Sequence, residues 1–283
     1  DAFQKEGLRV FGPTKAAAQI EASKAFSKDL MKKNNIPTAN YTNFSDVEEA
    51  KEYLRTCSYP TVVKASGLAA GKGVIICENQ EQAENALNEI MSDKIFGSSG
   101  DTVVIEDFLQ GQEVSIHALS DGNTAVIFPT SQDHKQVYDG DQGPNTGGMG
   151  VIAPIDWVTD SNMQTVKTKI VQPALDGLKN EGANFVGCLY PGLMINGEDV
   201  NTVEFNARFG DPETEVYMRL LDSDIVEIFE SCVDGNLDPD NVQWKSGYAV
   251  TVVLASGGYP KKYETGLPIS GIDEAEKIDN VVV

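Results

Sequence analysis

A carboxylate, a carboxamide and a guanidinium alternate along one short stretch of the sequence, VEFNARFGDPE. Glu204, Asn206 and Arg208 occupy every second position there, and an extended strand places such positions on one face. Carboxylate and amide oxygens suit Mg²⁺, which also keeps waters and phosphate oxygens as ligands. An arginine can clamp a phosphoryl group with two hydrogen bonds. The stretch favours a metal and phosphoryl site; a solvated edge strand, which also alternates polar and apolar residues, is the alternative.

A second stretch, VVKASGLAAGKGVII at residues 62–76, is typical of a loop that holds phosphate. It is not a Walker A loop, because only three residues separate Gly67 from Gly71 and a glycine follows Lys72 where a hydroxyl is needed. The following VIIC is a strand pattern, so no helix N-terminus is available for a pyrophosphate. We therefore predict a hairpin whose glycines lie over phosphate oxygens. An ordinary glycine-rich hairpin is the other interpretation.

Lys64 ends the strand before this loop and shares a face with Val62. A lysine among β-branched residues is seldom buried unless it is paired. Phosphate is a natural partner, whereas a lysine that reaches the surface along its stem would be unremarkable.

Two further stretches carry weaker signals. IEDFLQGQEVS has the form of a turn that could hold an adenine between apolar side chains, with a carboxylate for the ribose hydroxyls, although acidic and apolar hairpins are common. In TSQDHKQVYDGDQGPNTGGMG, Thr146 and the glycines 147, 148 and 150 form a plausible anion nest. Asp133 and Lys135 offer a carboxylate for an amine and a cation for a carboxylate or phosphate. The two histidines, His117 and His134, are more simply read as structural.

Composition narrows the class of protein. The 283 residues carry a formal charge of −21 and show no basic stripe, which argues against a nucleic-acid binder. No apolar run reaches the roughly 20 residues that span a bilayer. The four cysteines form no CxxC pair, so reduced thiols in a cytoplasmic protein are expected.

The elements that must position these stretches alternate without strict βαβ order. Residues 12–37 predict one helix, which begins at Pro13 and Thr14 and ends near Asn34. Strands are expected at 61–64, 74–77, 102–109, 113–120 and 124–128, and again at 186–195 and 201–207 around an NGED turn. Hairpins of this kind indicate antiparallel sheets with helices packed on them, an α+β class. Residues 131–150 show no period, and a stretch of that length in a compact domain is usually functional or disordered.

Taken together, KASGLAAGKGV, SQDHK, GPNTGGMG and EFNARFGDPE closely resemble, in order and spacing, the phosphoribosylamine–glycine ligases (glycinamide ribonucleotide synthetases) of the ATP-grasp superfamily. The resemblance covers roughly residues 11 to 271. It implies an ATP-grasp domain at 1–237, in which 39–109 form a small lid and 1–38 with 110–237 form the larger subdomain. By the same resemblance, residues 238–283 would begin a C-terminal domain that stops early, and the N-terminal domain usual in the family would be missing before residue 1.

The resemblance also implies the chemistry. ATP would phosphorylate the carboxylate of glycine, and the amine of 5-phosphoribosylamine would capture the glycyl phosphate to give an amide, ADP and phosphate. Two alternatives stay open: another ATP-grasp ligase acting on a different carboxylate, or a nucleotide-binding fragment without turnover. No nucleic-acid or membrane partner is expected, and the parent polypeptide can carry further domains of purine biosynthesis.

By the same resemblance, Glu204 and Asn206 would hold Mg²⁺ (or Mn²⁺), and Arg208 would steady the transferred phosphoryl group as the catalytic residue. The ATP contacts would come from Lys24, Lys64, Gly67, Leu68, Ala69, Ala70, Gly71, Lys72, Gly73, Glu106, Asp107, Phe108, Leu109 and Glu113. The substrate side would be lined by Asp133, Lys135, Thr146, Gly147, Gly148, Asp211 and Pro212.

Overall fold

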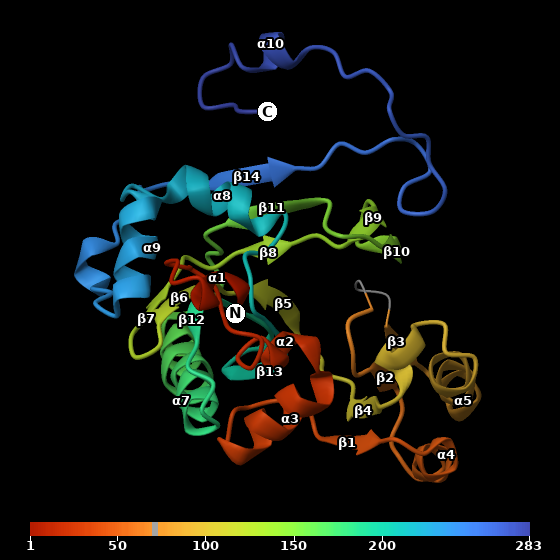
Figure 1. The fold of residues 1–283 in the computed structure, drawn as a ribbon. Helices are drawn as coiled ribbons and strands as arrows, with labels where there is room; N and C mark the ends of the chain where they lie inside the picture. The colour runs from red at the N-terminus through yellow and green to blue at the C-terminus, as the bar shows by residue number, and fades with distance from the viewer. Residues whose placement is uncertain (70–72) are drawn as a thin grey trace.

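The computed structural model describes residues 1–69 and 73–283, which form a body, a smaller lobe beside it and an extended C-terminal segment (Figure 1). Every strand ladder among the described residues is antiparallel. The prediction of an α+β protein with antiparallel sheets and packed helices is therefore confirmed.

The small lobe is one four-stranded sheet in the order β1-β4-β2-β3, with helices α4 and α5 on one face (Figure 1). Its own core packs Leu54, Leu87 and Ile90 from the helical side against Val63 and Ile105 of the sheet. The lobe comprises β1 (Tyr41–Phe44), α4 (Val47–Leu54), β2 (Thr61–Ala65), β3 (Val74–Cys77), α5 (Gln80–Leu87), the π-helical η1 (Asn88–Ser92), the 3-10 turn η2 (Gly97–Gly100) and β4 (Val103–Asp107).

The glycine-rich stretch connects two antiparallel neighbours. Thr61 pairs with Cys77 and Lys64 pairs with Val74, so the glycine-rich stretch is flanked by two antiparallel strands, and β3 rather than a helix begins directly after Gly73. The hairpin prediction is confirmed, and the Walker A alternative is excluded by geometry as well as by sequence. Ala70, Gly71 and Lys72 lie outside the described residues.

The body is built on a five-stranded sheet whose central strand, β12 (Val186–Asn196), is long enough to pair with two short strands along one edge. β6 (Ala118–Asp121) pairs with its first half, and β5 (Gln112–Ser115) pairs with its second half. The single strand expected at 113–120 is thus two strands. β13 (Asp199–Asn206) pairs with the other edge of β12, and β7 (Ala125–Ile127) pairs with β6.

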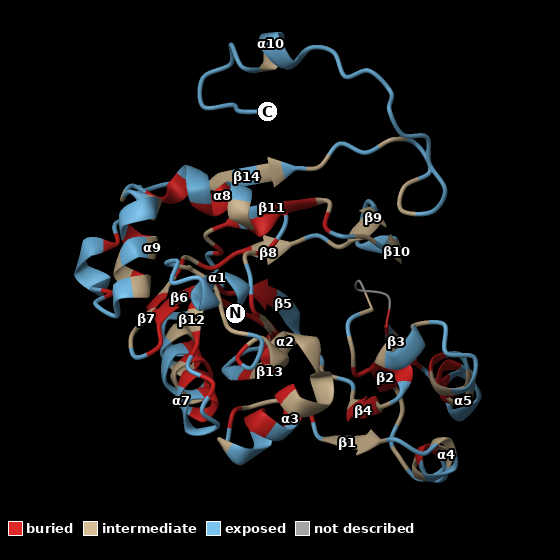
Figure 2. Ribbon diagram, viewed as in Figure 1, coloured by how far each residue is buried: buried red, intermediate tan, exposed pale blue. Residues whose placement is uncertain are grey.

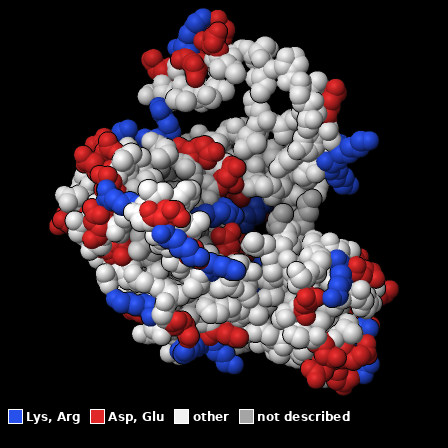
Figure 3. Space-filling view, in the orientation of Figure 1, with Lys and Arg blue, Asp and Glu red and all other residues white. Residues whose placement is uncertain are grey.

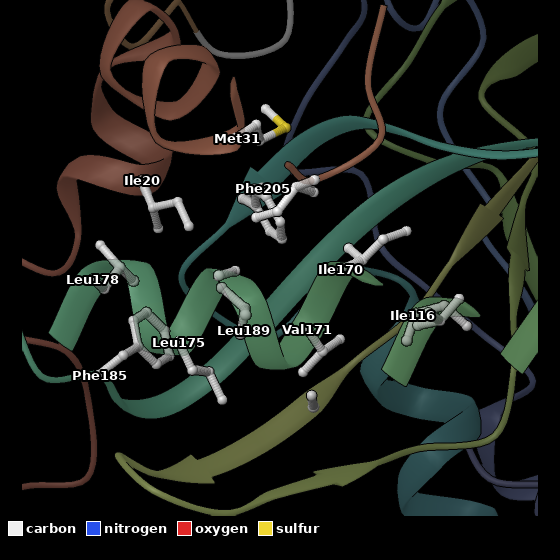
Figure 4. Packing of buried hydrophobic residues seen from close by; sticks show 14 of the residues in the cluster. Ile20, Met31, Ile116, Ile170, Val171, Leu175, Leu178, Phe185, Leu189 and Phe205 are labelled. Carbon is white, nitrogen blue, oxygen red and sulfur yellow. The ribbon is translucent and has the colours of Figure 1, made fainter. Parts of the chain in front are cut away.

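A nearly continuous helix covers one face of this sheet, formed by α6 (Asp160–Thr165), the π-helical η3 (Val166–Val171) and α7 (Gln172–Asn180). Its apolar side contributes Ile170, Leu175 and Leu178 to the core cluster that also contains Phe185 and Leu189 (Figure 4). Burying such side chains contributes about 1.5–3 kcal/mol each. The buried residues of the body and of the lobe form separate groups (Figure 2).

The single helix predicted for residues 12–37 is wrong. The chain forms α2 (Gln19–Ala22) and α3 (Lys24–Lys33), separated by Ser23, whose backbone is extended at φ −135° and ψ 108°. The Ser23 hydroxyl accepts from the Phe26 N–H and caps the second helix. The break places Lys24 in the first turn of α3.

The aperiodic stretch after β7 is ordered into short strands. β8 (Gln132–Asp133), β11 (Gly150–Ala153) and β14 (Ala249–Val252) form a three-stranded sheet, and β9 (Gln136–Tyr138) pairs with β10 (Gln142–Asn145). The remaining elements are α1 (Ala2–Lys5), α8 (Glu213–Leu220), α9 (Ile225–Asp234), η4 (Pro239–Asn241) and α10 (Ile272–Ala275). The division of the chain into domains at residue 237 stays a prediction.

The segment after β14 is mostly exposed and leaves the body (Figures 1 and 2). Within the described ranges, no helix combines the length and apolar character that crossing a membrane requires.

Candidate functional site

Three buried charges meet where the small lobe joins the body. The carboxylate of Glu106 on β4 pairs through one oxygen with Lys28 Nζ of α3, at 2.5 Å, and through the other oxygen with Lys64 Nζ of β2. Each side chain is at most 4% exposed. We call Lys28, Lys64 and Glu106 the lysine triad. Because one carboxylate faces two ammonium groups, the triad as a set holds an excess positive charge away from water.

The triad is bound to the strand that carries the alternating polar residues. Lys28 Nζ donates to Thr38 Oγ1 at 2.7 Å, and the Thr38 hydroxyl donates to the Thr202 carbonyl at 2.6 Å. Lys64 Nζ also reaches the Val203 carbonyl at 3.5 Å. Burial lowers the pKa of Lys28, and attraction to Glu106 opposes that effect. Lys64 thus contacts the residue next to Glu204 on β13, and Lys28 is linked through Thr38 to the residue before that one.

Lys24 lies at the same junction. Its N–H donates to the Ser66 carbonyl at 2.7 Å, and the N–H of Ala25 donates to Ser66 Oγ at 3.1 Å, which docks the start of α3 on the end of β2. Burial lowers the pKa of Lys24, and the strongest opposing influence is attraction to Glu204. Lys24 therefore has Glu204 as its main electrostatic neighbour.

The described ends of the glycine loop are packed tightly on the lobe. Gly67 N–H donates to the Ser99 carbonyl at 2.9 Å, and Ser99 Oγ donates to the Leu68 carbonyl at 2.8 Å. A Cβ on Gly67 would lie 2.6 Å from the Ser99 backbone, so that position accepts only glycine without a shift. Leu68 is exposed, and Gly73 is buried beside Ala69.

The residues of the turn expected to hold an adenine face different surroundings in the structure. The Glu106 carboxylate points into the lysine triad, while Asp107 accepts from the Asn40 amide at 2.8 Å and Phe108 is exposed. Leu109 is half-buried. Gly111, at φ +152°, lies so close to β12 that a Cβ would be 2.4 Å from the Ile195 carbonyl oxygen. Of the carboxylates predicted to contact the nucleotide here, that of Glu106 is thus bound to two lysines.

A second group of charges lies on the body side. Lys135 Nζ bonds Glu113 Oε2 at 2.8 Å, with 43% and 50% of the two side chains exposed. Burial, the largest single influence, lowers the pKa of Lys135, but attraction and hydrogen bonding to Glu113, together with attraction to Glu204 and Asp133, outweigh it and the pKa is raised. Asp133 of β8 lies beside this pair. We call Glu113, Asp133 and Lys135 the Asp133 cluster.

The glycine turn after β10 packs against Asp133. A Cβ on Gly148, at φ +130°, would lie 2.8 Å from Asp133 Oδ1 and 2.3 Å from Pro212 Cδ, so only a glycine fits between them. Thr146 Oγ1 accepts from Gly148 N–H at 3.0 Å, and Gly147 N–H donates to the Tyr259 hydroxyl at 3.2 Å. This contact brings the C-terminal segment onto the predicted anion nest, and no sequence signal indicated Tyr259.

One hollow brings Glu204 and the Asp133 cluster together. It is lined by Glu113, Val114, Ser115, Asp133, Lys135, Tyr190, Gly192, Leu193, Val203 and Glu204. The surface is hollowed between the lobe and the body, and basic and acidic atoms gather beside that depression (Figure 3). The two stretches that the sequence placed at the metal and substrate sides thus share one wall.

Glu204 is half-buried, and its carboxylate makes no ion pair or hydrogen bond with any other described side chain. Asn206 Oδ1 receives only a long contact of 3.4 Å from Arg208. Two oxygen donors at alternate positions of one strand, neither strongly engaged, fit a cation that takes its other ligands from water and phosphate. Among the described residues there is no cluster of three His, Cys, Asp or Glu side chains that would form a complete protein cage.

Apart from its long contact with Asn206, Arg208 is bound to groups outside this pair of donors. Its Nε bonds Glu21 Oε1 at 3.1 Å, and Nη1 donates to the Phe209 carbonyl at 3.0 Å. It borders a different, largely apolar cavity of about 530 Å³ that Phe11 and Phe229 also line. In this structure the guanidinium is therefore held by Glu21, a partner that sequence reasoning missed.

His117 supports the loop after β13 from inside the body. It is fully buried, and its Nε2 accepts from the Gly210 N–H at 2.9 Å, which leaves the proton on Nδ1, 3.2 Å from the Tyr217 hydroxyl. Burial lowers the His117 pKa to about 3, so the ring stays neutral. The structural interpretation of His117 is confirmed, and its role is to hold the backbone between Arg208 and Asp211.

Comparison with known proteins gives a consistent result. Residues 22–214 match the model of the family described as "Phosphoribosylglycinamide synthetase, ATP-grasp (A) domain". The chain is 47% identical over 273 residues to the phosphoribosylamine–glycine ligase of Clostridium acetobutylicum, covering 96% of this chain and 66% of that protein. It is 46% identical over 307 residues to the bifunctional purine biosynthetic protein purD of Dictyostelium discoideum, covering all of this chain and 38% of that protein.

Solved structures extend the similarity to the fold. The crystal structure of the Thermotoga maritima phosphoribosylamine–glycine ligase superposes with a TM-score of 0.81 at 39% identity, covering 90% of this chain and 64% of that one. The biotin carboxylase domain of the Hydrogenobacter thermophilus 2-oxoglutarate carboxylase superposes with a TM-score of 0.66 at 23% identity, covering 88% of this chain and 53% of that one. The second likeness concerns the fold alone.

Proposed function

The chain belongs to the phosphoribosylglycinamide synthetase family and has the ATP-grasp fold, and from this premise we propose that it forms the catalytic core of an ADP-forming carbon–nitrogen ligase. The substrates we propose are glycine and 5-phosphoribosylamine, with ATP as the phosphoryl donor. The products are glycinamide ribonucleotide, ADP and phosphate.

The nucleotide would lie between the small lobe and the body. Lys24 and Lys64 are the proposed phosphate ligands. The described ends of the glycine loop (67–69 and 73) would lie over the phosphates and supply backbone N–H groups other than that of Gly67, which is bonded to the Ser99 carbonyl. The turn at 107–109 and Glu113 would frame the adenine and ribose. The contacts of Glu106 favour a role other than ribose binding. Its carboxylate is paired with Lys28 and Lys64 and would hold both lysines beside the nucleotide site.

Mg²⁺ (or Mn²⁺) would be held by Glu204 and Asn206, and it would neutralise charge on the phosphates. Arg208 would steady the transferred phosphoryl group after exchanging Glu21 for that anion. Positioning and charge neutralisation supply the catalysis, with no side-chain nucleophile. The substrate side would be lined by the Asp133 cluster, the turn Thr146–Gly148 and the residues Asp211 and Pro212.

One observation carries this proposal: Glu204 shares a hollow with Asp133 and Lys135 while the lysine triad is bound to the neighbouring residues of the same strand. A phosphoryl donor, a metal ion and an acceptor could therefore lie next to one another in this hollow. The chain spans only part of its relatives, and some of these are named as bifunctional purine biosynthetic proteins. We propose that further domains of the parent polypeptide act beside this core.

The test is ADP release from the chain with ATP, Mg²⁺, glycine and phosphoribosylamine. Glu204→Ala should lower turnover by about 100-fold or more, because removal of a preorganised charge at the reacting phosphate costs on that order. Its urea unfolding curve should match the parent chain, since Glu204 makes no side-chain bond. Glu198→Ala, at the exposed turn before the same strand, is the matched control and should turn over normally. Normal turnover by Glu204→Ala would remove the metal assignment.

A further inference from the structure

We propose that Asp133 is the group that takes the proton from the attacking amine as the amide forms. This inference rests on the proposed ligase function and concerns its second step. Substrate binding alone was predicted for Asp133. The inference adds that its carboxylate accepts a proton during amide formation.

The position of the carboxylate is the first argument. Asp133 lines the hollow that also contains Glu204, so it faces the region where the acyl phosphate would form. Its Oδ1 is out of contact with water and has no hydrogen-bond partner among the described residues. A buried acceptor without a donor costs free energy, and the incoming N–H of an amine is a donor that would satisfy it.

The backbone around Asp133 holds this oxygen in place. The turn at Gly148 covers it so closely that a Cβ would lie 2.8 Å away, and β8 fixes the Cα opposite Val151 of β11. The carboxylate is therefore preorganised by main chain on both sides rather than by a partner that would have to leave before reaction.

The charges that face Asp133 tune it toward proton transfer. Burial raises its pKa to about 7; repulsion from Glu213 of α8 and from Glu113 of β5 adds to that effect, and attraction to Lys135 opposes it. The His134 backbone N–H also opposes it. A general base works best when its pKa lies near the working pH.

The other acid–base groups of this wall are already engaged. Glu113 is bound to Lys135. The Tyr190 hydroxyl donates to Glu213, and burial raises the pKa of that phenol well above its ordinary range. Glu204 is the proposed metal ligand. Glu204 also lacks a side-chain partner but is assigned to the metal, so among the other described titratable residues of the hollow Asp133 is the one with a buried, unpartnered carboxylate oxygen.

The step balances as follows. The amine nitrogen forms a bond to the carbonyl carbon of glycyl phosphate, and the carbon–oxygen bond to phosphate breaks with its electron pair on the departing phosphate. The nitrogen loses one proton, which Asp133 accepts and later returns to water. The amide keeps the remaining N–H.

The experiment compares the parent chain with Asp133→Asn, which keeps shape and removes the base. With ATP, Mg²⁺, glycine and phosphoribosylamine present, ADP and amide are measured together, and hydroxylamine is then added to trap glycyl phosphate as the hydroxamate. We expect ADP formation to continue while amide formation falls about 10²–10⁴-fold, with hydroxamate in place of the amide. Asp139→Asn, exposed on the β9–β10 turn, is the control and should keep ADP and amide in equal amounts.

A role in holding glycine would give a different pattern. ADP and amide would then fall together, whether or not the KM for glycine rises, and this would overturn the proposal; so would unchanged, equal yields. In the parent chain, amide formation per ADP should decline as the pH falls below about 7, and Asp133→Asn should lack that decline.

A measurement without turnover separates this proposal from the ligase assignment. The side-chain carboxyl carbon of Asp133, identified by its loss in Asp133→Asn, should titrate near pH 7 in a ¹³C NMR series. Titration in the ordinary aspartate range would overturn the proton-acceptor role whatever the chain catalyses. A parent chain that makes neither ADP nor amide, but whose Asp133 titrates near neutrality, would count against the proposed function and not against this property of Asp133.

Discussion

The lysine triad and the Asp133 cluster are both mixed charge groups at the same site, yet they are built in opposite ways. The triad is almost completely buried, and its one carboxylate serves two lysines. In the Asp133 cluster, the ion pair is about half exposed, and the remaining carboxylate has a buried oxygen without a partner. Both carboxylate oxygens of Glu106 are ion-paired, whereas the buried oxygen of Asp133 has neither an ion pair nor a hydrogen bond.

The difference follows from what each group must do in the proposed reaction. A phosphate ligand has to be held as a cation before the nucleotide arrives, which requires a buried counter-charge, because an isolated buried ammonium loses its proton. A proton acceptor has to be held without a counter-charge, because a strong partner would lower its basicity. The contrast predicts that removing the Glu106 charge and removing the Asp133 charge will change stability with opposite signs.

The largest effect should come from Glu106→Ala, which breaks the closed group. It would leave Lys28 and Lys64 buried without their carboxylate, and removal of one member of a buried ion pair costs about 3–5 kcal/mol. Urea unfolding at pH 7 measures this as a lower midpoint. Lys28→Met, which leaves one lysine on the carboxylate, is the comparison and should cost less. A loss below about 1 kcal/mol for Glu106→Ala would show that the triad is not a closed unit.

An effect of opposite sign is expected from Asp133→Asn at alkaline pH. The folded pKa of Asp133, about 7, lies above the ordinary value of about 3.9 in an unfolded chain. The folded state therefore binds the proton more tightly, and ionised Asp133 opposes folding above pH 7. That opposition disappears as the pH falls through 7 toward about 4.

Asp133→Asn should therefore be more stable than the parent chain at pH 8 and equal to it near pH 4. The upper limit is about 4 kcal/mol, and contact of the side chain with water reduces it. Unfolding curves at the two pH values provide the measurement. Equal stability at pH 8 would mean that the carboxylate carries no burial cost.

The smallest effect should come from Glu113→Gln, which breaks the exposed ion pair with Lys135. Partly exposed pairs of this kind contribute about 0.2–1 kcal/mol and are screened by salt. The midpoint should shift only slightly, and raising the salt concentration should remove the difference from the parent chain. A loss as large as that of Glu106→Ala would erase the distinction between the two groups.

Local patterns in the sequence were enough to predict much of this arrangement. The glycine hairpin follows from β-branched runs on both sides of the loop, and the β12–β13 hairpin follows from its turn residues. Both depend on neighbours along the chain, which is the information that a sequence carries most directly. Lys64 was expected to be buried only if paired, and it is buried and paired.

The partners in the site depend on contacts between distant segments, and these were not predicted. Glu106 meets Lys64 because β2 and β4 are adjacent in a register that places Val62 opposite Glu106. Lys28 joins them because Ser23 interrupts the helix and α3 docks on Ser66. The serine was the available signal, since an N-cap residue inside an apparently continuous helix can start a new one.

The contact between Tyr259 and Gly147 shows that the proposed substrate side is contacted by a segment that adds nothing to the described core. Among the described residues, the three core clusters include nothing beyond Ala249, whereas the hydroxyl on the glycine turn comes from ten residues further along. Substitutions in this C-terminal segment should therefore change the stability of the folded state very little. Substitutions in this segment would change the surface around Gly147 with little effect on the free energy of unfolding.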